Sequence, residues 1–350
     1  MKTVLPNIES SFRLEQNIAF YLILFSKTTM PFIPHSDYNI AVPFMHKHKH
    51  VSTIYAGMFK NFSVPNYKRE TLELSDGDFL MVDYNLENTQ KAVILCHGLE
   101  GNSRRPYINS CATYFLARNY GVFAWNNRSC GGAMNRLPRL YHHAAIEDLD
   151  AVVQFALTKV EEVYLIGYSM GGAQVLNYFG RTQNMSSKVK AGIAVSVPVE
   201  VRSSAESLKQ GFNKVYMNNF TSGLSKKLKI KAQQFPELLD WSKIKDIKTF
   251  DELDDNFTAP LHGFKDREDY YFSVSPARNI ENISKPVLII NALDDPFLGD
   301  DCYPVDLATE HQYIHLETPK YGGHCAYPMK NTLHSYAEIR AFSFIEGLKR

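Results

Sequence analysis

Short apolar segments alternate with amphipathic segments along most of the chain. The apolar segments have the length and Val, Ile and Leu content of strands buried on both faces; they cover 92–96, 121–125, 162–166, 192–197, 285–291 and 313–316. One-face helical spacing is found over about 110–118, 143–157, 173–179 and 333–348. This alternation predicts a mostly parallel sheet with right-handed crossovers and helices on both faces.

Two segments near the start of this pattern are closer together. Glu70–Leu74 and Phe79–Tyr84 flank the polar connection Ser75-Asp76-Gly77-Asp78, which carries an Asp-Gly turn signal. They predict an antiparallel hairpin that forms one edge of the sheet.

The alternation stops over 198–283, where the sequence predicts helices and is rich in aromatic residues. We interpret 198–283 as a helical lid inserted between strands of the sheet. The predicted division is therefore an N-terminal extension and arm packing on the core (1–64), an α/β core (65–197 and 284–350) and this lid.

The composition is that of an ordinary globular protein, with 350 residues, 45% hydrophobic, 21% charged, and a formal net charge of +1. Charge this close to balance favours no nucleic-acid partner. The lysines gathered between Lys226 and Lys231 predict a solvated helix face. Five cysteines without a C-x-x-C spacing fit reduced thiols in a cytoplasmic protein. The sequence does not indicate an oligomeric state.

The longest apolar run, Ile18 to Phe25, is far shorter than the roughly 20 residues of a spanning helix, so no transmembrane span is expected. It also makes a poor signal peptide, because Glu9 and Glu15 precede it and Lys27 stands where small residues should prepare a cleavage site. Three interpretations stay open: a surface anchor in peripheral contact with a membrane, a docked helix, or an extension before a true start at Met30.

His46, His48 and His50 alternate with lysines. On a strand they would share one face, as metal ligands can, but no carboxylate or cysteine accompanies them. We favour a polar surface stretch and expect neither a metal nor an organic cofactor.

The hexapeptide Gly167-Tyr168-Ser169-Met170-Gly171-Gly172 has the pattern G-x-S-x-G. A predicted strand precedes it and a helical segment follows, which is the context of a nucleophile elbow. In such a turn the backbone is strained and the serine hydroxyl stands clear of the sheet, while the two outer positions are too crowded for side chains. Ser169 is the predicted nucleophile.

A serine nucleophile needs a base that takes its proton and an acid that orients this base. In a sheet of this type the order along the chain is serine, acid, histidine. The loop after 285–291 carries Asp294-Asp295-Pro296, and the loop after the last strand carries His324. We predict Asp295, immediately before the proline, as the acid and His324 as the base. Asp294 is expected to bond loop amides and hold the turn.

The oxyanion of the reaction needs amide donors. One is expected from Met170, next to the nucleophile, and a second from the loop after an earlier strand. That loop is His97-Gly98-Leu99-Glu100-Gly101, in which Gly98 permits close approach of the backbone and Leu99 supplies the amide. His97 is a rival for the base, but its place in this loop favours a structural hydrogen-bonding role.

These motifs, taken together and in order, resemble the α/β-hydrolase superfamily, and more narrowly its YheT-like branch related to the abhydrolase-domain lipases and esterases. The motifs are His97–Gly101, Asn127–Gly132, Gly167–Gly172, Asp294–Pro296 and Gly323-His324, with further similarity at Thr53–Tyr55 and over 250–275. The resemblance covers about residues 30 to 350. It implies an α/β-hydrolase fold and a Ser-His-Asp hydrolase acting on carboxylic esters, often acyl or glyceride-type lipids. Ser129-Cys130 departs from the expected Arg-Gly, which could reshape the pocket wall.

The sequence thus predicts a cytoplasmic serine esterase of lipase-like type that cleaves short- to medium-chain acyl or glyceride esters through an acyl-enzyme. Two alternatives stay open: an acyltransferase that uses an alcohol acceptor, and a catalytically silent binding protein on the same fold. Acyl chain length and leaving group do not follow from the sequence.

Overall fold

The structure is a computed structural model that describes residues 32–33, 38–58, 62–87, 89–245 and 247–349. Within these residues nine strands form one sheet, in the order β1-β9-β8-β7-β6-β4-β5-β3-β2. The strands are β1 (Phe32–Ile33), β2 (Lys68–Glu73), β3 (Phe79–Asn85), β4 (Lys91–Cys96), β5 (Gly121–Asn126), β6 (Glu162–Tyr168), β7 (Val189–Val195), β8 (Val287–Ile290) and β9 (Ile314–Glu317).

The sheet is parallel except where β3 pairs with β2 and with β5. The predicted antiparallel edge hairpin is therefore confirmed, and so is the mostly parallel sheet. The strand predicted at 192–197 instead covers Val189–Val195. The two residues of β1 pair with β9 at the other edge and are too few to show a pattern in the sequence.

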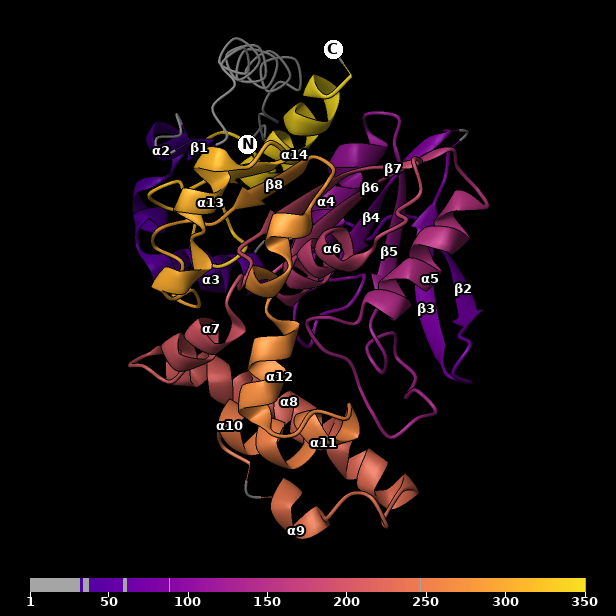
Figure 1. Ribbon diagram of the computed structural model, residues 1–350. Helices are drawn as coiled ribbons and strands as arrows, with labels where there is room; N and C mark the ends of the chain where they lie inside the picture. Colours follow the sequence, from indigo (N-terminus) through magenta and orange to yellow (C-terminus); the bar gives the residue numbers. More distant parts are fainter. Residues whose placement is uncertain (1–31, 34–37, 59–61, 88, 246, 350) are drawn as a thin grey trace, which may run out of the picture.

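Helices cover both faces of the sheet, as predicted (Figure 1). On one face α5 (Ile146–Leu157), α6 (Met170–Arg181) and α13 (Val305–Glu310) pack in one buried apolar cluster with the strands. On the other face α4 (Pro106–Leu116) and α14 (Tyr336–Gly347) pack in a second such cluster. Apolar burial on both faces explains why the central strands are continuously apolar in sequence.

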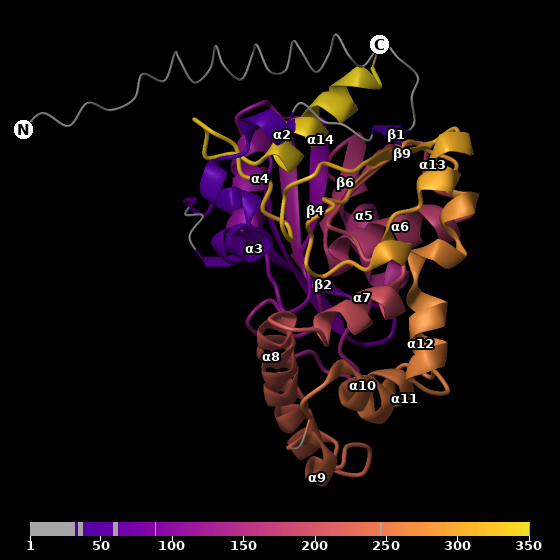
Figure 2. The same ribbon diagram turned by 90° about the vertical axis from the view of Figure 1, so that its left-hand side faces the viewer.

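Residues between β7 and β8 form a group of helices that we call the cap. It comprises α7 (Val201–Leu208), α8 (Asn213–Gln234), α9 (Trp241–Ile244), α10 (Phe250–Leu253), the π-helix η2 (Asp254–Thr258), α11 (Ala259–Leu261) and α12 (Arg267–Val274). The cap extends beyond one end of the sheet (Figures 1 and 2). Two 3₁₀ turns, η3 (Pro276–Arg278) and η4 (Ile280–Asn282), lead from it to β8, and a third, η5 (Asp300–Cys302), follows β8.

Residues 38–58, which we call the arm from here on, are mainly helical and do not form the strand considered for the His-Lys stretch. This segment comprises α2 (Tyr38–Ala41), the 3₁₀ turn η1 (Phe44–Lys47) and α3 (Lys49–Met58). His46 thus lies in the 3₁₀ turn, His50 in α3 and His48 at the bend between them, so the three do not share one face of a strand. Among the described residues no group of three or more His, Cys, Asp or Glu side chains could hold a metal ion.

Two further expectations from the sequence concern the cysteines and membrane-spanning helices. All five cysteines are free thiols and buried, as expected for reduced cysteines. Among the described helices none has both the length and the apolar character needed to cross a membrane. The residues of the run Ile18 to Phe25 lie outside the described part of the chain.

Candidate active site

Ser169 lies in a sharp turn between β6 and α6. Its backbone has φ 54°, in the left-handed region that a non-glycine residue adopts only under constraint. The turn is crowded on both sides of the serine. A Cβ at Gly167 would lie 2.1 Å from the Gly171 carbonyl oxygen, and a Cβ at Gly171 would lie 2.3 Å from that of Cys96. Both positions therefore require glycine, as the G-x-S-x-G pattern predicts.

The loop after β4 lies directly against this turn. A Cβ at Gly98 would lie 3.1 Å from the Ser169 Cβ, so the backbone of the loop passes close to the serine. Three of its amides have partners. Those of Gly98 and Glu100 bond to the hydroxyls of Tyr107 and Tyr141, and that of Gly101 bonds to the Gly98 carbonyl.

The amide of Leu99, between those of Gly98 and Glu100, donates no hydrogen bond to a residue that the structure describes. The amide of Met170 is the first of α6, and the first amides of a helix have no intrahelical acceptor. Leu99 and Met170 also line one cavity together with Ser169. The structure thus brings both predicted oxyanion donors to the predicted nucleophile.

His97 is held as a structural group and is not available as a base. It is fully buried, its Nδ1 bonds the Gly98 carbonyl at 2.7 Å, and its Nε2 accepts the Asn127 amide at 3.1 Å. Burial lowers its pKa to about 4, so the ring is neutral at physiological pH. Both ring nitrogens are occupied, and the ring ties the loop after β4 to the loop after β5.

Asp295 and His324 meet at the ends of β8 and β9. Both carboxylate oxygens of Asp295 lie 3.0 Å from His324 Nδ1, and Oδ1 also accepts the Phe297 amide. The ring of Phe297 stacks on the His324 ring with centroids 4.0 Å apart. Burial lowers the pKa of His324, but Asp295, with a further contribution from Cys325, outweighs it and raises this pKa to about 10.

Asp294 points to a different partner. Its Oδ1 accepts the Gly323 amide at 2.9 Å, so it bridges the loop after β8 to the loop that carries His324. Burial raises the pKa of Asp294 to about 6. The arm supports the same loop, because the Thr53 hydroxyl accepts the His324 amide at 2.9 Å.

Phe297 connects the cavity that Ser169 lines to the ring of His324. Ser169 and Phe297 line the same cavity, and Phe297 stacks on His324. Within the described residues no hydrogen bond joins Ser169 Oγ to the His324 ring. Such bonds are often long in the absence of substrate and tighten when substrate binds.

The cavity beside Ser169 has a volume of about 100 Å³ and lies between the cap and the loops at the carboxyl ends of the strands. Most of its lining is apolar; the cap contributes Val201, Ala205, Leu208, Phe220, Leu224, Leu228, Phe250, Leu253, Phe257 and Leu261. An apolar cavity with a few polar groups at one end is the usual form of a small-molecule site.

Polar side chains that the sequence did not single out also line this cavity. They include Asp254 from the π-helix η2 together with His142, His143 and His262. The Tyr271 hydroxyl donates to Asp254 at 2.9 Å, and burial raises the pKa of Asp254 to about 7. The structural signal for a functional role at Asp254 is the π-helical turn, because such turns are frequent at functional sites. The sequence pattern does not reveal a π-helical turn, so sequence reasoning did not single out this residue.

Of the four lysines predicted to form a solvated helix face, Lys226 and Lys229 are exposed, whereas Lys227 and Lys231 correct the expectation. Lys231 is fully buried and donates to the carbonyls of Asn135 and Leu137, both at 2.5 Å. Lys227 reaches the loop after β4, where its ammonium lies 2.6 Å from Glu100 Oε1. A cationic residue with its stem on apolar surface can therefore look like a surface residue in sequence and still anchor two elements.

Lys227 meets a small network around Glu100. The Tyr141 hydroxyl accepts the Glu100 amide at 2.9 Å and donates to Glu100 Oε1 at 2.6 Å. Lys227 also lies 3.2 Å from the thiol of Cys130, one of the two residues that depart from the family pattern. Glu100 itself has φ 53°. The cap helix α8 thus holds the strained residue that follows Leu99.

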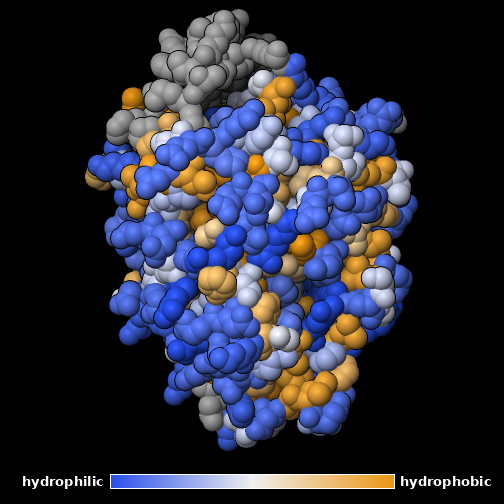
Figure 3. All heavy atoms as spheres, viewed as in Figure 1, coloured by the Kyte–Doolittle hydropathy of each residue, from blue (hydrophilic) through white to orange (hydrophobic). Residues whose placement is uncertain are grey.

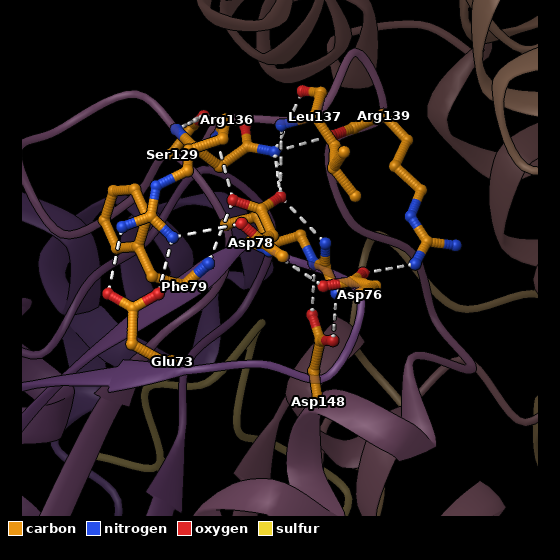
Figure 4. Close-up of polar contacts among 12 residues, drawn as sticks. Glu73, Asp76, Asp78, Phe79, Ser129, Arg136, Leu137, Arg139 and Asp148 are labelled. Atoms are coloured by element: carbon orange, nitrogen blue, oxygen red, sulfur yellow. Dashed lines mark hydrogen bonds and ion pairs between the residues drawn. The ribbon is translucent and has the colours of Figure 1, made fainter.

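A second buried ionic network fixes the loop that follows β5. The Arg128 guanidinium bonds both carboxylate oxygens of Asp148 and also contacts Asp76 and Asp78. Figure 4 shows these three carboxylates gathered in one place. Asp78 in turn accepts from Asn135 Nδ2 at 2.6 Å. This network connects the edge hairpin to the segment that supplies the cavity residues 140–143. Removing one partner would leave a buried charge uncompensated.

The chain matches the family model for the alpha/beta hydrolase fold over residues 91–314. The chain belongs to the α/β-hydrolase family. Its relatives include mouse phospholipase ABHD3, 30% identical, with 75% of this chain and 66% of that protein covered. The chain therefore spans about two thirds of the length of that relative. Putative esterase YheT of Escherichia coli is 28% identical, with 81% and 86% covered.

Solved structures agree on the fold. The esterase PF2001 of Pyrococcus furiosus superposes with a TM-score of 0.52 at 18% identity, covering 81% of this chain and 91% of that one. The predicted α/β-hydrolase fold and the resemblance to the YheT-like and abhydrolase-domain branch are confirmed. The names of these two relatives, a phospholipase and a putative esterase, agree with the expected class of carboxylic ester hydrolase.

Proposed function

We propose that this α/β hydrolase is a serine esterase that cleaves short- to medium-chain acyl or glyceride-type esters through an acyl-enzyme, with Ser169, His324 and Asp295 as its triad. The observation that carries the proposal is the Asp295–His324 pair, which meets through Phe297 the cavity lined by Ser169 and Leu99. Mouse ABHD3 is named a phospholipase, and a yeast relative, 26% identical, is named a monoacylglycerol lipase. Both names fit an ester of a lipid.

The geometry supports the following mechanism. Ser169 Oγ attacks the acyl carbon while Nε2 of His324 takes its proton, since Nδ1 faces Asp295. The Asp295 carboxylate keeps the ring in this orientation and stabilises the cation that forms. The amides of Leu99 and Met170 bind the oxyanion, a contribution of about 3 kcal/mol for each donor. His324 then gives the proton to the leaving alcohol, and water activated by the same ring resolves the acyl-enzyme.

The cap acts as a lid over the acyl chain in this proposal. Its side chains form most of the apolar lining next to Ser169, so a longer acyl chain buries more surface there. Each buried methylene contributes about 0.8 kcal/mol. Activity should therefore rise from acetyl esters toward medium-chain esters.

A hydrolysis screen over p-nitrophenyl esters of graded chain length tests the proposal, together with labelling by a fluorophosphonate. We expect labelling at Ser169 and a rising chain-length profile. A chain that is neither labelled nor active would support the silent binding protein instead. If the acyl product appears on an added alcohol in preference to water, the acyltransferase alternative holds. A flat or falling profile would contradict the role of the cap.

A further inference from the structure

Four apolar side chains of the arm are exposed to solvent. Ile40, Phe44 and Met45 are 79%, 86% and 74% exposed, and Val51 is 39% exposed. We call these four residues the arm patch. Most of the face shown in Figure 3 is hydrophilic, with hydrophobic side chains in scattered patches, as is usual for a water-facing surface. Three large apolar residues exposed this far within six positions are unusual there and indicate a binding surface.

The arm is bonded to the C-terminal part of the chain, so its exposure is not that of a loose segment. The Tyr38 hydroxyl bonds the Pro328 carbonyl at 3.2 Å, and the Ala41 carbonyl accepts the Lys330 amide at 2.8 Å. Val42 and Ala56 are buried. The arm therefore presents the patch from a fixed position.

Along the sequence of the arm the formal charges are all positive. From Tyr38 to Arg69 the sequence contains no Asp or Glu. Lys47 and Lys49 lie between the patch residues and form no ion pair with any residue in the described part of the chain. Lys320 adds a third positive charge near Lys47, because both ammonium groups lie over the ring of Tyr321, at 5.3 and 5.5 Å from its centroid.

The patch continues onto the cap. The ring of His50 lies 4.7 Å from that of Phe212, which is 50% exposed at the start of α8, and Val215 on the next turn is 55% exposed. Figure 2 shows α3 and the beginning of α8 next to each other. The same arm helix holds the His324 loop through Thr53. The surface thus lies beside both the cap and the candidate active site.

We propose that the arm patch, with Lys47 and Lys49, docks the protein on an anionic lipid membrane. Apolar side chains that project singly can enter the boundary between headgroups and acyl chains, while lysines remain at the level of the phosphates. Lysines near an anionic leaflet add attraction that falls with ionic strength. Docking would bring the cap side of the cavity to the lipid. The surface observations do not depend on the function proposed above.

Co-sedimentation of the full chain with vesicles tests the proposal. The vesicles are phosphatidylcholine alone, or phosphatidylcholine with phosphatidylserine. We expect preference for the anionic vesicles and loss of this preference at high salt. Phe44→Ser with Met45→Ser should weaken binding about tenfold or more, since two anchors are lost. Lys47→Gln with Lys49→Gln should reduce binding to anionic vesicles by about tenfold and leave binding to neutral ones unchanged.

Matched controls use residues of the same type away from the patch. Phe272→Ser with Leu333→Ser removes two side chains that are 59% and 67% exposed, and Lys226→Gln with Lys265→Gln removes two exposed lysines. Binding by these variants should stay within about twofold of the parent. Hydrolysis of a soluble p-nitrophenyl ester, thermal unfolding and solution mass should be unchanged in every variant.

Three results would overturn the docking proposal. The full chain may fail to bind anionic vesicles, or the Phe44 and Met45 variant may bind as well as the parent, which would assign binding to residues outside the patch such as Ile18 to Phe25. A lower solution mass for that variant without vesicles would mean that a second copy covers the patch. An inactive parent that still binds vesicles through the patch would instead contradict the proposed esterase and leave docking intact.

Discussion

The loops at the carboxyl ends of the strands and the helices of the cap line the same cavity, but their polar groups are held in place by different means. In the loops, which we call the sheet edge below, backbone conformation fixes the position of these groups. Ser169 takes φ 54° because Gly167 and Gly171 allow two strands and a helix to meet, and the Leu99 amide is left over after its neighbours have bonded. In the cap, long side chains decide, since Lys227 and Lys231 reach from α8 to the loops below.

This difference has a consequence for function. A position set by the backbone tolerates little change, because no other residue type fits the turn. A position set by a long side chain can be loosened without loss of the fold. We therefore expect substitutions at the sheet edge to abolish turnover and substitutions in the cap to reduce it gradually.

The largest effect should follow Ser169→Ala. Loss of the nucleophile of a triad costs on the order of a millionfold in kcat. The fold should persist, because alanine keeps the Cβ that the turn already accommodates. Turnover of a soluble ester and thermal unfolding, measured on the same sample, check both statements. Near-normal turnover, with contaminating esterase excluded by fluorophosphonate labelling, would refute the assignment of the nucleophile.

Substitution of Asp295 should lower kcat by orders of magnitude more than substitution of the neighbouring Asp294. Asp295 contacts His324, so Asp295→Asn should lower kcat about ten-thousandfold by favouring the wrong tautomer of the ring. Asp294 accepts the Gly323 amide, so Asp294→Asn should act mainly on stability. Each is the matched control of the other, compared at equal folded fraction. A larger loss of kcat in Asp294→Asn would place the acid one residue earlier.

The pH dependence should reflect the charge of Asp295. His324 can accept the serine proton only when it is neutral, and its pKa is raised to about 10. The value of kcat/KM should therefore fall about tenfold per pH unit below the His324 pKa, with a midpoint above the 6.5 of an ordinary histidine. In Asp295→Asn the residual activity should show a lower midpoint, because burial then acts without the opposing charge. An unchanged midpoint in that variant would contradict the pairing.

The sheet and its edge motifs could be predicted because they depend on local pattern. Continuous apolar runs follow from burial on both faces, and Gly167, Gly171 and Gly98 follow from backbone crowding. The cap could not be predicted in the same detail. Burial of Lys231 depends on carbonyls about 95 positions away in the chain, at Asn135 and Leu137.

The helical structure of the arm could not be predicted from local sequence pattern either. Alternating His and Lys fit a strand as well as a helix when no apolar period decides between them. The structure forms α3 there because Ser52, Thr53 and Ala56 pack against the protein on one face of a helix. Contacts distant in sequence thus selected the helix, and the same contacts connect the arm to the His324 loop.

The smallest effect on kcat should follow loss of the ion pair between Lys227 of the cap and Glu100 of the oxyanion loop. Lys227→Met removes the ammonium that pairs with Glu100 and leaves a largely buried carboxylate with Tyr141 as its remaining partner. Glu100 then loses part of what holds its left-handed backbone, and the Leu99 amide before it becomes less well placed for the oxyanion. Complete loss of one donor costs about 100- to 1000-fold in kcat, and loosening it should cost about tenfold. KM should change little, because the apolar lining is intact.

Lys226→Met is the matched control for this variant, since Lys226 precedes Lys227 on α8 and is exposed. Its kcat should stay within about twofold of the parent. Lys227→Arg should recover part of the activity, because arginine restores the charge beside Glu100 in a different geometry. A purely structural role would lower the melting temperature of Lys227→Met and leave kcat per folded molecule unchanged. Equal kcat values for Lys226→Met and Lys227→Met would show that the cap only encloses the cavity, while a selective loss in Lys227→Met would show that it also positions the oxyanion loop.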